Sequence, residues 1–275
     1  FAKKDFDNEM LQHRDIDVKL RPLYRFVLAD SKDNVNYALR FRYENALIDR
    51  MLADSPLPLA ITSSDTLKLK SPDRTADRIY SLPDNAESEF LKALQDISTK
   101  QFNSAMIHYG NAVDKSADGK YGELYKAFYY MNRAVLRADM IEFISSIENN
   151  VQTLTMDDQG TTRARVKDQV SRGYDYSDAL EDVRKAAEIV DNIPYIHFNL
   201  GNLLCLSSSF VEAIDSYSKA IRLYPYMGDA YFNRGLVLIY LKDKEKGCID
   251  LSHAGELGVS DAYGVIKKYC EEAEQ

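Results

Sequence analysis

The feature that most constrains this chain is a short motif that recurs after 34 residues. Residues 198–201 read FNLG and residues 232–235 read FNRG, and each leads into an apolar stretch with the character of a helix interior. Glycine inside a helix costs roughly 0.5–1 kcal/mol relative to alanine. Its recurrence at one spacing predicts that a second helix packs closely at both positions and offsets that cost.

Other positions follow the same period. A unit that starts at Pro194 has an L-G pair at positions 7 and 8, followed by small or aromatic residues at positions 20, 24 and 27 and a proline at position 32: Leu200, Gly201, Ala213, Tyr217, Ala220 and Pro225. This pattern resembles the tetratricopeptide repeat (TPR) family. The resemblance implies antiparallel helix pairs, with Gly201 against Ala213 and Gly235 against Gly247.

The period extends over most of the chain and predicts a helical TPR-like repeat domain over 86–275. An amphipathic stripe near the C-terminus predicts a helix that covers the open end of the stack. The expected units are 86–119, 120–159, 160–193, 194–227 and 228–261, with the capping helix at 261–273.

Residues 1–85 have a different pattern, with alternating apolar residues in DIDVKLRPLYRFVLAD and YALRFRYE on either side of the turn-like SKDNVN. Two arrangements remain open for this region: a small β-containing module, or extended segments packed along the repeats. The predicted fold class is therefore mostly α, a TPR-type right-handed superhelix of antiparallel helix pairs preceded by a small β-containing N-terminal region.

Strands followed by tyrosine-rich repeats also resemble the C-terminal part of some large bacterial cell-envelope TPR proteins. That resemblance implies an exported, periplasm-facing protein. The chain begins FAKKDF without an initiator Met, which we interpret as an excised fragment or a processed chain.

Charge and apolar content narrow the classes of partner. The net charge is −8, and all of this excess lies after residue 85, because residues 1–85 carry 14 basic and 14 acidic side chains. An acidic repeat domain argues against nucleic acid as a partner. No apolar run reaches the length of a membrane helix, so direct membrane insertion is not expected. We interpret the three cysteines, Cys205, Cys248 and Cys270, as buried free thiols.

No catalytic or cofactor motif is found in the sequence. The four histidines lack metal-ligand spacing, and no nucleophile elbow, Walker loop or dinucleotide-binding loop occurs. The sequence therefore predicts no enzymatic activity, no metal site and no cofactor.

The TPR resemblance instead implies a concave groove lined by the first helix of each unit. Residues matching the groove positions are Asn132, Tyr195, Phe198, Asn199, Asn202, Asp229, Phe232 and Asn233. An asparagine amide both donates and accepts hydrogen bonds, as a peptide backbone requires. Equally open is the alternative that Asn132, Asn199 and Asn233 tie neighbouring helices together.

Two functions follow from this groove. The first is a non-enzymatic scaffold that binds a peptide or protein segment there. The alternative is a structural module of a larger envelope protein whose groove is filled by its own N-terminal region. Occupation of the groove by residues 1–85 would favour the alternative.

Overall fold

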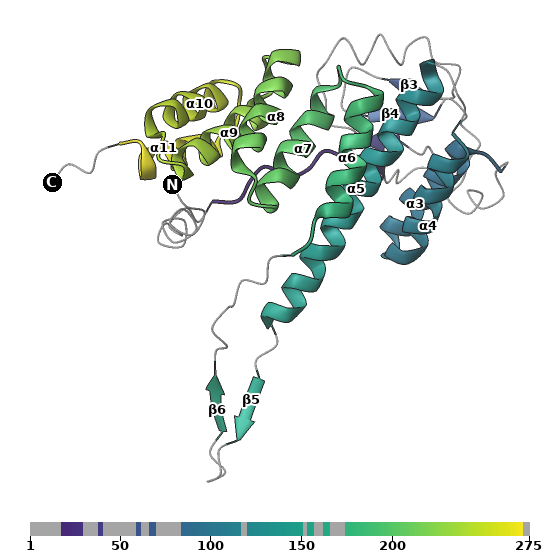
Figure 1. Cartoon of the computed structure of the whole chain (residues 1–275), viewed down its shortest axis with the longest axis horizontal. Helices are drawn as coiled ribbons and strands as arrows, with labels where there is room; N and C mark the ends of the chain where they lie inside the picture. The colour runs from purple at the N-terminus through teal and green to yellow at the C-terminus, as the bar shows by residue number, and fades with distance from the viewer. Residues whose placement is uncertain are drawn as a thin grey trace.

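The computed structural model shows a stack of helices (Figure 1). It describes residues 18–29, 38–40, 59–61, 66–69, 84–116, 120–150, 153–156, 162–165 and 174–271. This described part is mostly helical, as predicted. Its helices are α3 (Ala86–Ser98), α4 (Phe102–Asp114), α5 (Lys120–Asn150), α6 (Ser177–Ile189), α7 (Pro194–Leu206), α8 (Phe210–Leu223), α9 (Gly228–Tyr240), α10 (Lys244–Glu256) and α11 (Asp261–Tyr269).

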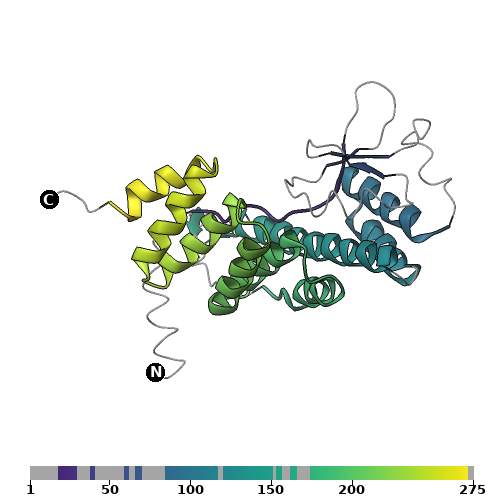
Figure 2. The same ribbon diagram turned by 90° about the horizontal axis from the view of Figure 1, so that it is seen from above.

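Successive helices pack in pairs, α3 with α4, α5 with α6, α7 with α8 and α9 with α10 (Figure 2). In three of the pairs a residue in the left-handed region follows the first helix, two positions after its last residue: Lys100, Ser208 or Lys242. The residue that follows each of them donates its N–H to the carbonyl five residues earlier, which is the Schellman arrangement. The same hydrogen-bonded turn therefore follows the first helix of three pairs, as expected of a structural repeat.

The predicted units 120–159 and 160–193 differ from the structure. A single helix, α5, has 31 residues and pairs directly with α6. In the sequence, two short antiparallel strands separate α5 from α6: β5 (Thr153–Met156) and β6 (Thr162–Arg165). No Gly or Pro occurs from residue 123 to residue 150, so nothing in the sequence stops α5 where a first helix would end.

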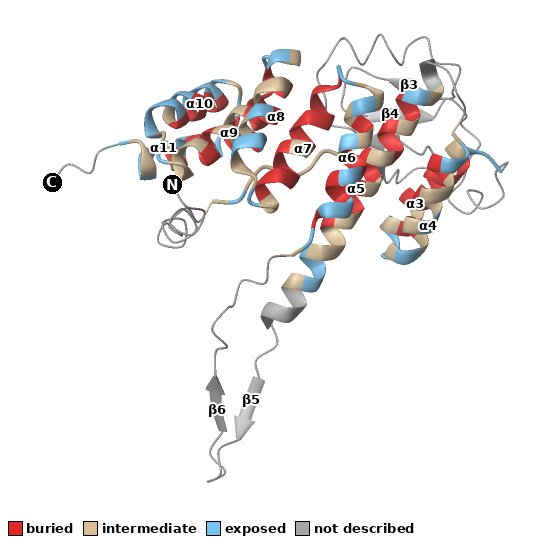
Figure 3. Cartoon of the chain, viewed as in Figure 1, coloured by how far each residue is buried: buried red, intermediate tan, exposed pale blue. Residues whose placement is uncertain are grey.

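The glycines lie at helix–helix contacts. A Cβ added at Gly235 would approach the carbonyl oxygen of Gly247 at 2.9 Å, as predicted. A Cβ at Gly201 would first meet the ring of Tyr217 at 2.6 Å, on the same helix as the predicted partner Ala213. Buried positions, red in Figure 3, gather on the faces where paired helices meet.

The helix α11 lies within the range 261–273 where the sequence predicts a capping helix. Ala262 and Val265 are buried, and Ile266, Tyr269 and Cys270 pack against the same apolar cluster. Phe232 of α9 belongs to this cluster, so α11 closes the C-terminal end of the stack.

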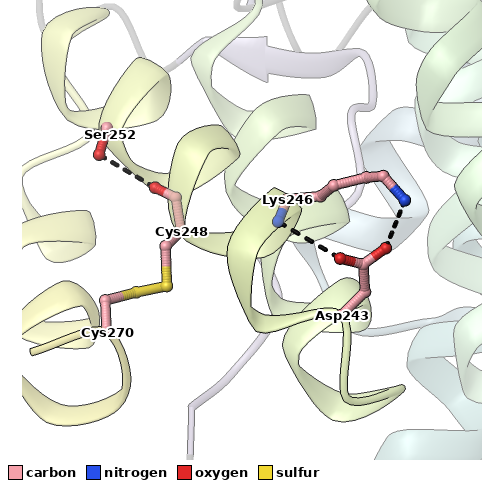
Figure 4. Close-up of a disulfide and its surroundings, with 5 residues drawn as sticks. All are labelled: Asp243, Lys246, Cys248, Ser252 and Cys270. Carbon is pink, nitrogen blue, oxygen red and sulfur yellow. Dashed lines mark hydrogen bonds and ion pairs between the residues drawn. A yellow bond between two sulfur atoms is a disulfide. The ribbon is translucent and has the colours of Figure 1, made fainter. Parts of the chain in front are cut away.

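A disulfide joins Cys248 and Cys270, so the prediction of three free thiols is wrong (Figure 4). Their Cα atoms are 5.8 Å apart. The apolar pattern concealed this pairing because Cys248 lies on α10 and Cys270 at the end of α11, and only the return of α11 onto α10 brings them together. Cys205 is the free, buried thiol, as expected.

Short strands are described within residues 1–85. They are β1 (Val27–Ala29), β2 (Ala38–Arg40), β3 (Leu59–Ile61) and β4 (Thr66–Leu69), in the antiparallel order β1-β2-β4-β3. Most of this region, including the predicted turn at 31–36, lies outside the described residues. The β-containing module and the division into domains at residue 85 therefore stay predictions.

Residues 18–26 follow one of the two arrangements that the sequence left open, an extended segment packed along the repeats. The alternation there also fits a strand, but the structure assigns regular β pairing only from Val27 onward. Residues 18–26 instead run along the helix stack, as the purple trace in Figure 2 shows.

Candidate binding site

The candidate site is the surface where residues 18–26, here called the groove segment, lie against α5, α7 and α9. We call this helix surface the inner face. The segment runs from the α9–α11 end of the stack toward α3 and α5, in the direction opposite to the order of the helices (Figure 2). Two regions more than 100 residues apart in sequence thus form one site.

Three asparagines on the inner face hold the backbone of the groove segment. Asn199 accepts from the N–H of Tyr24 at 2.8 Å and donates to its carbonyl at 2.7 Å. Asn132 makes the same pair of bonds with Phe26, at 3.0 and 2.9 Å. Asn233 accepts from the N–H of Arg21 at 2.7 Å and donates toward its carbonyl at 3.3 Å.

Asn202 supports this arrangement from α7. It donates to the carbonyl of Arg21 at 2.8 Å, and its own oxygen accepts from Asn233 and from the hydroxyl of Tyr217. Asn132 likewise donates to the hydroxyl of Tyr109, a neutral group because burial raises its pKa. Asparagines of the inner face thus bind the segment and also link neighbouring helices.

Acidic side chains hold the two arginines of the groove segment. Arg21 donates to Asp229 at 2.8 Å and to Asp261, the first residue of α11, at 2.9 Å. Arg25 makes a two-pronged contact with Asp139 of α5, one prong of which is 2.9 Å long. Charge-assisted bonds of this kind are about twice as strong as neutral ones.

Aromatic side chains receive Tyr24. Its ring centroid is 4.7 Å from that of Tyr195 and 5.1 Å from that of Phe198, within the range of favourable ring pairs. Its hydroxyl donates to Asp229 at 2.7 Å. One carboxylate of Asp229 therefore accepts from both Arg21 and Tyr24, one oxygen for each.

Phe26 is the deepest residue of the groove segment, with 3% of its surface exposed. Its ring meets Phe128 of α5 at 4.9 Å and Phe90 of α3 at 6.2 Å between centroids, both edge-on. At the other end of the segment, Val18 and Leu20 pack against the cluster that contains Phe232.

All eight residues predicted to line a groove are placed around residues 18–26. Seven touch the segment through a hydrogen bond, ion pair or ring contact, and Phe232 lies in the cluster that its first residues cover. Sequence reasoning missed Asp139, Asp261, Phe90 and Phe128. Phe128 and Asp139 carried a signal, because they lie four residues before and seven residues after Asn132 and so share its face of α5.

A second polar cluster lies between α3 and α4, away from the inner face. Glu89 is buried and accepts from Lys92 at 2.8 Å and from Asn111 at 3.0 Å, with His108 at 2.7 Å. Burial raises the pKa of Glu89, but these hydrogen bonds outweigh it and lower the pKa to about 2. The cluster ties α3 to α4.

Two features are absent from the described residues. There, no group of three His, Cys, Asp or Glu side chains is arranged to hold a metal ion. Within the same ranges, no helix combines the length and the apolar character needed to cross a bilayer.

The paired helices, their common turns and their 34-residue spacing define the class of fold: a stack of TPR-type helix pairs. No family model and no curated protein matches the sequence. Among solved structures, MamA is similar with 14% identity and a TM-score of 0.47, over 68% of this chain and 86% of that chain.

Two other solved structures have comparable similarity. YrrB, described as a TPR protein with an unusual peptide-binding site, has 16% identity and a TM-score of 0.44, over 66% of this chain and 74% of its own. A thermophilic TPR protein from Thermus thermophilus has 14% identity and a TM-score of 0.44, over 71% of this chain and 85% of its own. At these scores the likenesses are descriptive only, and the repeat architecture rests on the helix pairs of this chain.

Proposed function

We propose that this chain is a non-enzymatic protein-interaction module whose inner face binds an extended protein segment, and that its resident ligand is its own residues 18–26. The observation that carries the proposal is the set of amide pairs from Asn132, Asn199 and Asn233 to single residues of the segment. Each pair satisfies one backbone N–H and one C=O, the two groups that an extended chain leaves unpaired.

Occupation from within the same chain favours the structural version of this function. A ligand on the same chain binds intramolecularly, so a free peptide must exceed the effective concentration of the segment to displace it. In this role the repeats fix the position of the chain directly before β1. The module therefore joins its N-terminal region to the repeats without any further partner.

The disulfide supports the predicted periplasmic or cell-envelope location. Disulfides persist in oxidising compartments and are rare in the reducing cytosol. Cys248–Cys270 also fixes the end of α11, whose first residue, Asp261, holds Arg21. An oxidising compartment therefore preserves the disulfide that stabilises the end of the stack where Arg21 binds.

Limited trypsin digestion of the Arg25–Phe26 bond tests the proposal. We expect the bond to resist cleavage in the parent protein, because Asn199 and Asn132 hold the backbone on both sides of it. Asn199→Ala removes two hydrogen bonds, about 1–3 kcal/mol, and should speed cleavage by roughly 5- to 150-fold.

Asn103→Ala is the matched control, since Asn103 is an exposed asparagine on α4, away from the inner face. It should leave the cleavage rate at Arg25 unchanged. Fast cleavage in the parent, or equal rates in the parent and Asn199→Ala, would show that the inner face does not hold residues 18–26.

A further inference from the structure

We infer that the inner face also accepts a segment of another protein in exchange for residues 18–26, and that this ligand carries an arginine, an aromatic residue three positions later, and then Arg-Phe. This inference rests on the proposed function and adds the chemistry of an external ligand. The groove segment itself, VKLRPLYRF, displays this pattern at Arg21, Tyr24, Arg25 and Phe26.

The burial of the segment is that of an exchangeable ligand. Of its nine residues only Phe26 is buried, while Lys19 and Pro22 are exposed and the others are half-buried. Beneath it the helices pack on one another through their own side chains, such as Tyr195, Phe198 and Tyr217. The apolar side chains of the segment other than Phe26 lie at the edge of this core and are partly exposed.

The spacing of the motif follows from the repeat. Asn199 and Asn233 occupy the same position in successive units and bind Tyr24 and Arg21, three residues apart. Three residues of polyproline II chain span roughly 9 Å, which matches the 8–10 Å between packed helices. Pro22 favours this conformation and lacks an N–H that would need a partner.

Charge supplies the sequence preference that backbone bonds lack. The segment carries three basic residues and no acid, namely Lys19, Arg21 and Arg25. The carboxylates of Asp229, Asp261 and Asp139 face the two arginines. A ligand with acids at these positions would bring like charges together, so the site selects basic and aromatic segments.

A binding experiment with the full chain tests the exchange. The double variant Arg21→Glu/Tyr24→Ala removes the ion pairs of Arg21 and the ring contacts of Tyr24 but leaves Phe26 in place. We call it the disarmed variant. The probe is a fluorescent peptide with the sequence of residues 18–28, followed by anisotropy. We expect it to bind the disarmed variant at least about tenfold more tightly than the parent, where the tethered segment competes.

Two controls isolate the site. Lys19→Glu alters an exposed charge of the same segment and should behave like the parent. A peptide with glutamates in place of both arginines should bind the disarmed variant at least about tenfold more weakly than the probe. Arg21→Glu alone keeps every apolar contact and replaces the double variant if circular dichroism shows that the latter is unfolded.

Equal binding of the probe to the parent and to a folded disarmed variant would overturn the inference, as would equal binding of the glutamate peptide. The trypsin experiment separates this failure from that of the proposed function. If trypsin does not cleave after Arg25 and the probe does not exchange, only the further inference is wrong. If trypsin cleaves there readily, the proposed function and the further inference are both wrong.

Discussion

Gly201→Ala is expected to destabilise the protein, although alanine is the better helix former. Gly201 lies in the interior of α7, where the added Cβ would stand 2.6, 2.7 and 2.9 Å from three atoms of the Tyr217 ring. Real Cβ atoms essentially never come so close, so the ring must move. Tyr217 is fully buried, and its ring centroid lies 5.8 Å from that of Phe198.

The magnitude follows from two opposing effects. Alanine gains roughly 0.5–1 kcal/mol of helix propensity. Overpacking a rigid core costs roughly 1–3 kcal/mol. Displacing the ring also weakens the bond from the Tyr217 hydroxyl to Asn202, worth about 1 kcal/mol. The net expectation is a loss of about 1–3 kcal/mol in the free energy of unfolding.

Urea unfolding followed by circular dichroism measures this loss, and Gly110→Ala is the matched control. Gly110 lies inside α4 with no atom within 4 Å of an added Cβ, so alanine there should stabilise by roughly 0.5–1 kcal/mol. In a double-mutant cycle with Tyr217→Leu, which removes the obstructing ring, the two losses should sum to more than the loss in the double variant. Additive losses, or a Gly201→Ala protein as stable as Gly110→Ala, would refute the reasoning.

Three further predictions concern the same stack. Gly235→Ala should lose at least as much stability in urea as Gly201→Ala, because its Cβ would press on the backbone oxygen of Gly247, which cannot rotate away. Replacing Cys248 and Cys270 by serine should cost about 3 kcal/mol, given their separation of 22 residues, and thiol titration in denaturant should find one thiol before reduction and three after it. The pKa of Glu89 falls from 4.5 to about 2 on folding, so its contribution to stability is complete above pH 4.5 and disappears as the pH falls toward 2; Glu89→Gln should flatten this acid limb in urea titrations.

The sequence predicts the repeats well where local rules suffice. The positions of α7 to α10 are predicted by local sequence patterns, namely the L-G pair, the small residues and the 34-residue period. It fails at α5, where 31 residues continue as one helix and the repeat period alone suggested a break. The nearest obstacle to a Cβ at Gly201 is the ring of Tyr217, one helical turn from the predicted partner Ala213. The spacing of residues predicts which helices pair but not which side chain makes the closest contact.

Part of the candidate site can be predicted from the sequence. The asparagines were found because their place in each unit faces the ligand side in TPR proteins. The ligand was anticipated only as the N-terminal region in general. Residues 18–26 could not be singled out, since the alternation before Val27 fits a strand as well as it fits a segment bound to helices. Arg21 and Asp261 are 240 residues apart, and no local pattern reports so distant a pairing. The disulfide was missed for a different reason: its two cysteines lie in apolar helical patterns that fit buried free thiols equally well.

Amide hydrogen exchange resolved by NMR at residues 21–26 tests the central claim most directly. The N–H groups of Arg21, Tyr24 and Phe26 donate to asparagine side chains, whereas the N–H groups of Leu23 and Arg25 have no hydrogen bond within the described structure. The account predicts slow exchange at the first three and fast exchange at the other two, with Asn199→Ala releasing Tyr24 first. Free-chain exchange rates at all five amides would contradict it.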